Sequence, residues 1–195
     1  MAADTRVVAA PSGQGDATAV QRVLDAALAG STRPVVLIDG GSGSGKSTLA
    51  TALVAAWPGR VSLVRLDDVY PGWDGLAAAS EHVREHALSD PHPRWRRWDW
   101  QAKRAGEWHA LDPQLPLIVE GCGSLSRANR ALATLGVWLE LDAEERRRRA
   151  IARDGDLYEP YWDRWAEQER RFAEREHPRD LADIVLAGGF GNTPE

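Results

Sequence analysis

Short apolar runs, rich in valine, isoleucine and leucine, alternate along the chain with stripes of apolar residues at helical spacing. The runs are bounded by turn-forming residues and predict strands buried on both faces. The stripes repeat every three or four residues and predict helices. The expected strands are residues 35–38, 61–66, 115–119, 137–141 and 181–186. The expected helices are residues 18–28, 47–57, 81–88, 127–135, 143–153 and 160–176.

This alternation predicts an α/β protein with three layers, α/β/α, around a mainly parallel sheet of five strands. A chain of 195 residues suits one domain with a well-buried core. Within a single domain over residues 1–195 we expect three additions to the sheet and its helices. They are an N-terminal extension with a helix (residues 1–33), a substrate-side insertion rich in proline and tryptophan (residues 71–112) and a lid-like helical region (residues 143–176).

The turn after the first expected strand matches the P-loop pattern G-x-x-x-x-G-K-[ST]. A buried strand runs into it and a helix runs out, which places successive backbone N–H groups at a helix N-terminus, where they can surround phosphate oxygens. The alternative is a glycine-rich turn without a ligand. The pattern predicts a P-loop NTPase fold whose nucleotide-binding residues are Gly40, Gly41, Ser42, Gly43, Ser44, Gly45, Lys46, Ser47 and Thr48.

The composition adds one observation about this loop and narrows the class of partner. Of 24 basic residues, 22 are arginine, so the lysine at Lys46 indicates a need for a compact ammonium group. A net charge of −5 disfavours a protein that coats nucleic acid. A single cysteine and the lack of a long apolar run favour a cytoplasmic protein with no membrane partner. Whether it forms a homo-oligomer is left open.

Carboxylates follow two of the expected strands. Asp67 and Asp68 end the second strand, and Glu120 ends the third. In open α/β sheets a ligand sits beyond the carboxyl ends of the strands, where one acid can hold Mg²⁺ and another can accept a proton. The alternative for each residue is a polar strand end that caps the next helix.

Residues 34–190 resemble the uridine kinase and phosphoribulokinase family of P-loop small-molecule kinases. Residues 67–70 (Asp-Asp-Val-Tyr) are similar to the family's segment with the catalytic aspartate, and residues 117–121 to its strand ending in Glu-Gly. Residues 141–154 resemble the lid helix whose arginines grip ATP phosphates, and residues 182–185 the last strand. The segment after Asp154 is shorter than the family's lid, which is a departure.

The resemblance implies an enzyme that uses ATP and Mg²⁺ to phosphorylate a hydroxyl of a small molecule, a nucleoside or a related compound. The implied catalytic residues are Lys46, Asp67, Arg149 and Arg153, and the implied metal ligands are Ser47, Asp67 and Glu120. Two alternatives remain: a kinase for nucleoside monophosphates, or a nucleotide-binding regulatory ATPase without a small-molecule acceptor.

The acceptor is expected near the segment that interleaves arginine with tryptophan, residues 94–100. Indoles can stack on a planar ring while arginine holds a phosphate. A loop packed on the sheet is the alternative, and single-stranded nucleic acid a third one. His82 and His86 have the spacing of a metal pair, but no third ligand is evident and an exposed helix face is preferred. The expected substrate-binding residues are Asp68, Tyr70, Arg97, Trp98 and Asp99.

Overall fold

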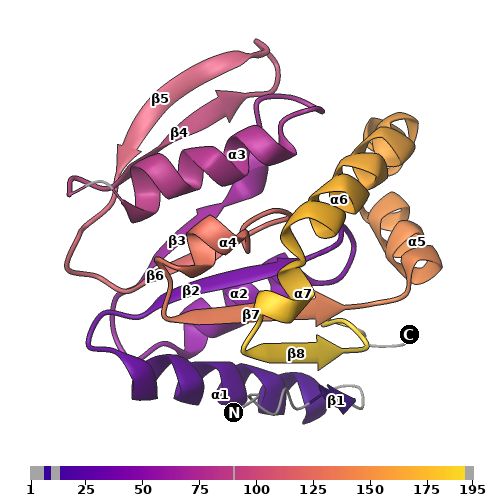
Figure 1. Ribbon diagram of the computed structural model, residues 1–195. Coiled ribbons are helices and arrows are strands. Elements are labelled where there is room, and N and C mark those ends of the chain that lie inside the picture. The colour runs from indigo at the N-terminus through magenta and orange to yellow at the C-terminus, as the bar shows by residue number, and fades with distance from the viewer. Residues whose placement is uncertain (1–6, 10–13, 90, 192–195) are drawn as a thin grey trace.

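The computed structural model describes residues 7–9, 14–89 and 91–191. Its centre is a parallel sheet with helices on both faces (Figure 1). The sheet order is β1 (Val7–Ala9), β8 (Ile184–Ala187), β7 (Leu135–Glu140), β2 (Val35–Gly40), β6 (Leu117–Glu120) and β3 (Ser62–Arg65). The five expected strands and the α/β/α class are confirmed, and the short β1 adds a sixth strand at the edge.

Side-chain alternation along the central strand β2 divides the interior into two cores. Val36 and Ile38 point into the core covered by α1 (Gln14–Gly30) and α2 (Lys46–Ala56). Val35 and Leu37 point into the opposite core. Because both faces are covered, the strand is apolar until it reaches Asp39, as the sequence pattern predicted.

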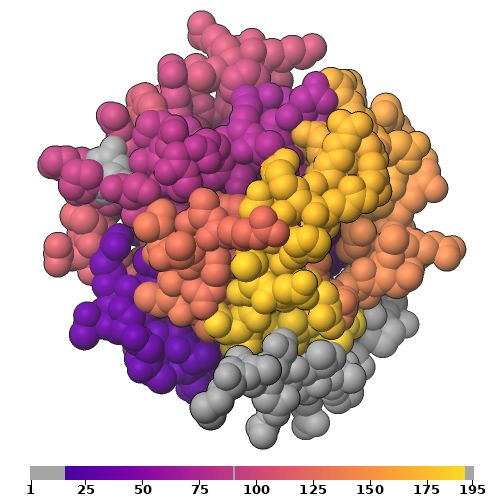
Figure 2. Space-filling model, in the orientation of Figure 1, coloured from indigo at the N-terminus to yellow at the C-terminus, as the bar shows by residue number. Residues whose placement is uncertain are grey.

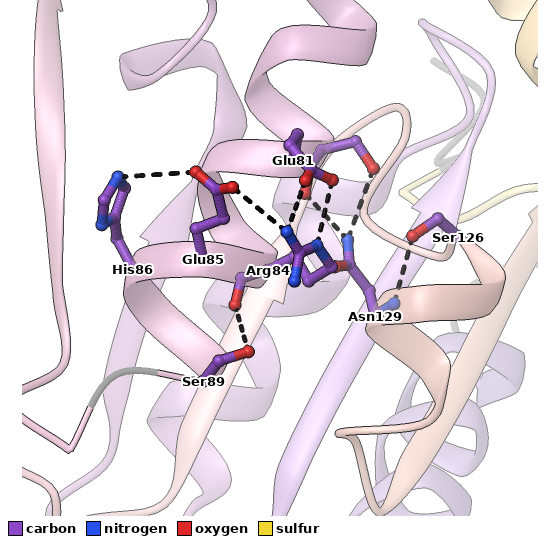
Figure 3. Close-up of polar contacts among 8 residues, drawn as sticks. Glu81, Arg84, Glu85, His86, Ser89, Ser126 and Asn129 are labelled. Atoms are coloured by element: carbon purple, nitrogen blue, oxygen red, sulfur yellow. Dashed lines mark hydrogen bonds and ion pairs between the residues drawn. The ribbon is translucent and has the colours of Figure 1, made fainter.

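The second face is covered by α3 (Leu76–His82), α4 (Arg127–Arg130), α6 (Trp162–Glu176) and the short α7 (Pro178–Leu181). The prediction of a helix over residues 127–135 was wrong, because α4 (Arg127–Arg130) ends early and β7 begins at Leu135. The helix predicted over residues 81–88 starts earlier, as α3 (Leu76–His82), and continues into the π-helical turn η2 (Val83–Leu88). In Figure 3, the Asn129 side chain of α4 points toward this segment. Its side-chain N–H donates a hydrogen bond to the Ser80 carbonyl oxygen.

Residues 71–112 contain a β-hairpin that the sequence pattern did not predict. It pairs β4 (Arg94–Asp99) with β5 (Arg104–Ala110) in antiparallel fashion and stands beside α3, apart from the main sheet (Figure 1). The register shifts between Arg96 and Trp98, so the simple alternation of side chains breaks there.

The lid-like region consists of α5 (Ala143–Asp154), two short 3₁₀ turns, η3 (Gly155–Leu157) and η4 (Glu159–Tyr161), and the long α6 (Trp162–Glu176). It leads into α7 (Pro178–Leu181) and β8. Figure 2 shows the C-terminal segments packed against the part of the chain that leads into α3. Among the described residues, no helix has the length and apolar character that crossing a bilayer requires.

Candidate nucleotide and acceptor site

The loop between β2 and α2 has the backbone conformation that a P-loop sequence predicts. Gly45, which precedes the first residue of α2, has a φ of 96°, and Gly43 has a φ of 84°. A β-carbon at Gly43 would lie 2.2 Å from the Arg146 carbonyl oxygen, and one at Gly45 would lie 2.2 Å from the Phe190 carbonyl oxygen. Both positions therefore require glycine, for conformation and for space.

Lys46, the first residue of α2, is buried beneath the loop that it follows. Its Nζ donates to the Gly41 carbonyl oxygen at 3.0 Å, which closes the loop on itself. Burial lowers the pKa of Lys46, but Cys122, Glu120, Glu169 and Asp39 outweigh that effect and raise it. The ammonium group is therefore charged at neutral pH and is available to an anion.

Asp67 and Glu120 meet the loop at one cavity of about 560 Å³. Glu120 is 2% exposed, and its Oε1 makes no hydrogen bond within the described residues, with Arg65 Nε 3.6 Å away. Burial raises the pKa of Glu120, and Asp67 raises it further, against the effects of Lys46, Ser47 and Arg65. A buried oxygen without a hydrogen bond, beside Ser47 and Asp67, has the chemistry that a Mg²⁺ ion prefers.

Asp67 lies in η1 (Leu66–Asp68), and its side chain opens into the cavity. Desolvation by its surroundings raises the pKa of Asp67; Asp68 and Asp154 also raise it, and Lys46 and Arg153 oppose the rise. Its backbone carbonyl accepts a hydrogen bond from Trp100 Nε1 at 3.0 Å, so the hairpin fixes the segment that carries this carboxylate. A carboxyl group with a raised pKa is a better proton acceptor.

Five aromatic side chains form much of the remaining cavity wall. Trp73 stacks on Tyr161 with ring centroids 4.4 Å apart and an angle of 8° between the rings. Trp73 also contacts Trp100 and Tyr158, at centroid distances of 5.1 and 5.6 Å. The aromatic residues that line the cavity are Tyr70, Trp73, Trp100, Tyr158 and Trp165.

Two tyrosines of this wall have buried hydroxyl groups. The Tyr70 hydroxyl donates to the Cys122 carbonyl oxygen at 2.8 Å, and its ring meets Trp165 edge-on. The Tyr158 hydroxyl is buried, and desolvation raises its pKa. The Tyr70 hydroxyl is thus used in a hydrogen bond within the protein, whereas Tyr158 places a hydroxyl group at the cavity wall.

Three arginines of α5, Arg146, Arg149 and Arg153, contact different parts of the protein. Arg153 lines the cavity and forms two hydrogen bonds with Asp154, at 2.9 and 2.6 Å. Arg149 does not line it, because its guanidinium group bonds to Glu145 at 2.8 Å. Arg146 instead contacts the P-loop, donating to the Ser42 carbonyl oxygen at 3.2 Å.

Three of the expected substrate-binding residues lie elsewhere. Arg97 and Trp98 line a separate cavity of about 270 Å³ between the hairpin and α3. Asp99 ends β4, and its Oδ1 accepts the backbone N–H groups of residues 101 and 102. Of the expected segment, residues 94–100, Trp100 reaches the main cavity, whereas Arg97, Trp98 and Asp99 do not line it.

Other expected residues are divided between two cavities. Ser42, Gly43, Gly45, Ser47 and Thr48 line the main cavity with Lys46. Gly40 and Gly41 line a second cavity of about 380 Å³ behind the loop. Ser44 is fully buried, and Asp68 is half-buried and lines neither cavity.

The histidine pair lies under the hairpin, away from the P-loop. His82 Nε2 accepts the Arg96 backbone N–H at 3.0 Å, and its ring stacks with Trp108. Burial, with the nearby charges of His86 and Arg96, lowers the pKa of His82 to about 4. Figure 3 shows His86 facing Glu85. In the part of the chain that the structure describes, no three histidine, cysteine, aspartate or glutamate side chains lie together in a way that could hold a metal ion.

Two charged residues near the loop were not singled out by sequence analysis. Arg146 lies at helical spacing from Arg149 and Arg153, which is a recognisable signal. Glu169 of α6 interrupts an apolar stripe formed by Trp162, Trp165 and Phe172, at intervals of three and four residues. A charged residue on a buried helix face indicates a specific partner.

No protein-family model matches this sequence, and no curated protein matches it. Among solved structures, the chain is similar to a protein described as a possible uridine kinase from Bacillus stearothermophilus. The TM-score is 0.62 and the identity 18%, over 87% of this chain and 98% of that chain. TT1252 from Thermus thermophilus matches with a TM-score of 0.43 and 20% identity, over 84% of this chain and 90% of that chain. The first likeness shows that this chain shares the fold of that protein.

Proposed function

We propose that the protein is an ATP-dependent kinase that transfers the γ-phosphoryl group to a hydroxyl of a nucleoside or a related ring-bearing compound. The observation that carries this proposal is the set of residues that line a single cavity. The P-loop, Asp67 and Glu120 line one part of it, and five aromatic side chains line much of the remainder. A phosphate donor and a planar acceptor would therefore meet beside a carboxylate.

The residues of the loop divide the work of binding the donor. Backbone N–H groups of the P-loop and the Lys46 ammonium would hold the β- and γ-phosphates. Ser47 and Glu120 would hold Mg²⁺, which, when bound, neutralises charge on the phosphates, and Asp67 is left for the chemical step. Arg153, which faces the same cavity, would steady the transferring group.

The chemical step requires a group that takes the hydroxyl proton, and we assign that role to Asp67. The acceptor oxygen forms a bond to the γ-phosphorus while the bond to the β-phosphate oxygen breaks. The hydroxyl proton passes to the Asp67 carboxylate. Local desolvation and neighbouring acids, which raise the pKa of this group, favour the transfer.

The charges of the cavity favour an acceptor without a phosphate group. Lys46 and Arg153 are the basic residues among those that line it, and both are assigned above to the donor and the transferring group. Arg97, the expected partner of an acceptor phosphate, lines another cavity. The stacked rings around Trp73 suit a base or a similar flat ring. A nucleoside therefore fits better than a nucleoside monophosphate.

The substitution Lys46→Ala tests the donor half of the proposal. It should weaken ATP·Mg²⁺ binding and reduce phosphoryl transfer at least a hundredfold, because an oriented charge in the site is lost. Lys103→Ala, the same change at an exposed hairpin turn, is the matched control and should leave both unchanged. Titration calorimetry and a phosphotransfer assay measure the two effects. Near-normal transfer by Lys46→Ala would refute the proposal.

A further inference from the structure

Glu169 reaches from α6 to the P-loop and contacts one group of the loop and two groups beside it. Its Oε1 accepts the backbone N–H of Ser42 at 2.7 Å and lies 3.2 Å from Cys122 Sγ. Its Oε2 is 3.1 Å from Arg146 Nη1. The same Arg146 nitrogen donates to the Ser42 carbonyl oxygen at 3.2 Å. One carboxylate and one guanidinium group thus hold both backbone polar groups of a single P-loop residue.

The side from which Glu169 approaches distinguishes two roles. A carboxylate on the phosphate side would compete with ATP for the loop, whereas one on the far side would support the loop. Glu169 and Arg146 line the 380 Å³ cavity behind the loop, with Gly40 and Gly41, and neither lines the 560 Å³ cavity. The contact is therefore made from behind, and the phosphate side of the loop stays open.

The burial of this pair sets it apart from the other ion pairs of the helix. The Glu169 and Arg146 side chains are 12% and 18% exposed. Glu167, on the same helix, pairs with Arg170 and Arg171, whose side chains are more than half exposed. Exposed pairs contribute little, while a shielded carboxylate that accepts a backbone N–H contributes more.

We propose that Glu169 is a positioning residue for the donor site, an inference that rests on the proposed function. It fixes Ser42 and Arg146 so that the P-loop holds its phosphate-binding shape before ATP arrives. A loop that is already ordered loses less conformational freedom on binding. Loss of Glu169 therefore acts on the affinity for ATP and leaves the transfer step in place.

The test compares Glu169→Ala, Glu169→Gln and the matched control Glu167→Gln in the full chain. Glu169→Ala should raise Kd and KM for ATP·Mg²⁺ about tenfold, with kcat and the acceptor KM within about twofold. Glu169→Gln, which keeps an acceptor for the Ser42 N–H, should recover part of the loss. Glu167→Gln should match the unmodified protein. Where Glu169→Ala fails to fold, Glu169→Gln decides, through the same split between KM and kcat.

A double-mutant cycle with Arg146→Ala adds an independent reading. The double variant should lose hardly more ATP affinity than either single variant, because the two side chains act as one unit. Unchanged ATP affinity in Glu169→Ala overturns the proposal, and tighter binding identifies Glu169 as a competitor for the loop. Failure of the unmodified protein to bind ATP·Mg²⁺ overturns the proposed function itself, which separates the two ideas.

Discussion

Asp39, the residue before the P-loop, ties the donor loop to the segment after β6. Its buried carboxylate accepts the backbone N–H groups of Gly40, Gly123 and Leu125, at distances between 2.7 and 3.2 Å. The second and third of these belong to the turn that follows Glu120. One side chain therefore fixes the distance between two parts of the site.

The pKa of Asp39 makes the stability of the protein depend on pH. Burial raises it from 3.8 to about 6, against the hydrogen bonds from Leu125, Gly40 and Gly123 and the charge of Lys46. The folded state thus holds this proton more tightly than the unfolded chain does. The resulting stabilisation is complete below about pH 4 and is lost as the pH rises through about 6.

The variant Asp39→Asn isolates this effect, because an amide does not titrate. The unmodified protein's free energy of unfolding, relative to the variant's, should fall by up to about 3 kcal/mol between pH 4 and pH 7. Urea unfolding of both proteins across this range measures the difference. A difference that stays constant with pH would show that Asp39 does not titrate there.

Single residues were predictable where their role is local to the sequence. The glycines, Lys46 and Ser47 follow from one short pattern, and the structure brings Asp67 and Glu120 beside them because parallel strands end at the same edge. Arg146 and Glu169 were not singled out, because their partner is a loop more than a hundred residues away in sequence. Which arginine of α5 faces the loop depends on how the helix docks.

At the scale of elements, the β4–β5 hairpin contributes to the site through a single tryptophan. Trp100 lies at its turn, lines the cavity and donates its indole N–H to the Asp67 carbonyl oxygen at 3.0 Å. It also contacts Trp73. The hairpin thereby connects the aromatic wall to the segment with the proposed base.

The substitution Trp100→Phe keeps an aromatic ring and removes this hydrogen bond. Loss of a bond of about 1 kcal/mol should lower kcat/KM for the acceptor about fivefold, with the KM for ATP unchanged. Trp108→Phe is the matched control, because Trp108 is on the same hairpin and is equally exposed, 40% against 38%, but lies outside the cavity. Equal losses in both variants would assign the effect to hairpin stability instead.

The strands could be predicted because their apolar runs are buried on both faces. The hairpin could not, since the segment that forms β4 interleaves arginine with tryptophan and packs only partly on the core. Its register shift after Arg96 also changes which side chains share a face. Trp98 was expected beside the acceptor, but Trp100 lines the main cavity and Trp98 lines another.

At the scale of the whole molecule, the parallel sheet brings distant segments to one edge. β2 carries the P-loop there, β3 leads to Asp67 and β6 to Glu120. The lid-like region and the hairpin approach the same edge from outside, and supply Tyr158 and Trp100. The chain order of these pieces was readable from the sequence, but the shape of the space between them depends on tertiary packing.

A coupled assay of ADP release tests the central proposal most directly, with ATP·Mg²⁺ and a panel of nucleosides, nucleotides, sugars and vitamins. We predict that ADP release depends on an unphosphorylated, ring-bearing acceptor. Asp67→Asn should lower that rate at least a hundredfold and keep ATP affinity within about twofold. The same rate of ADP release with and without every acceptor would contradict the account and indicate a nucleotide hydrolase.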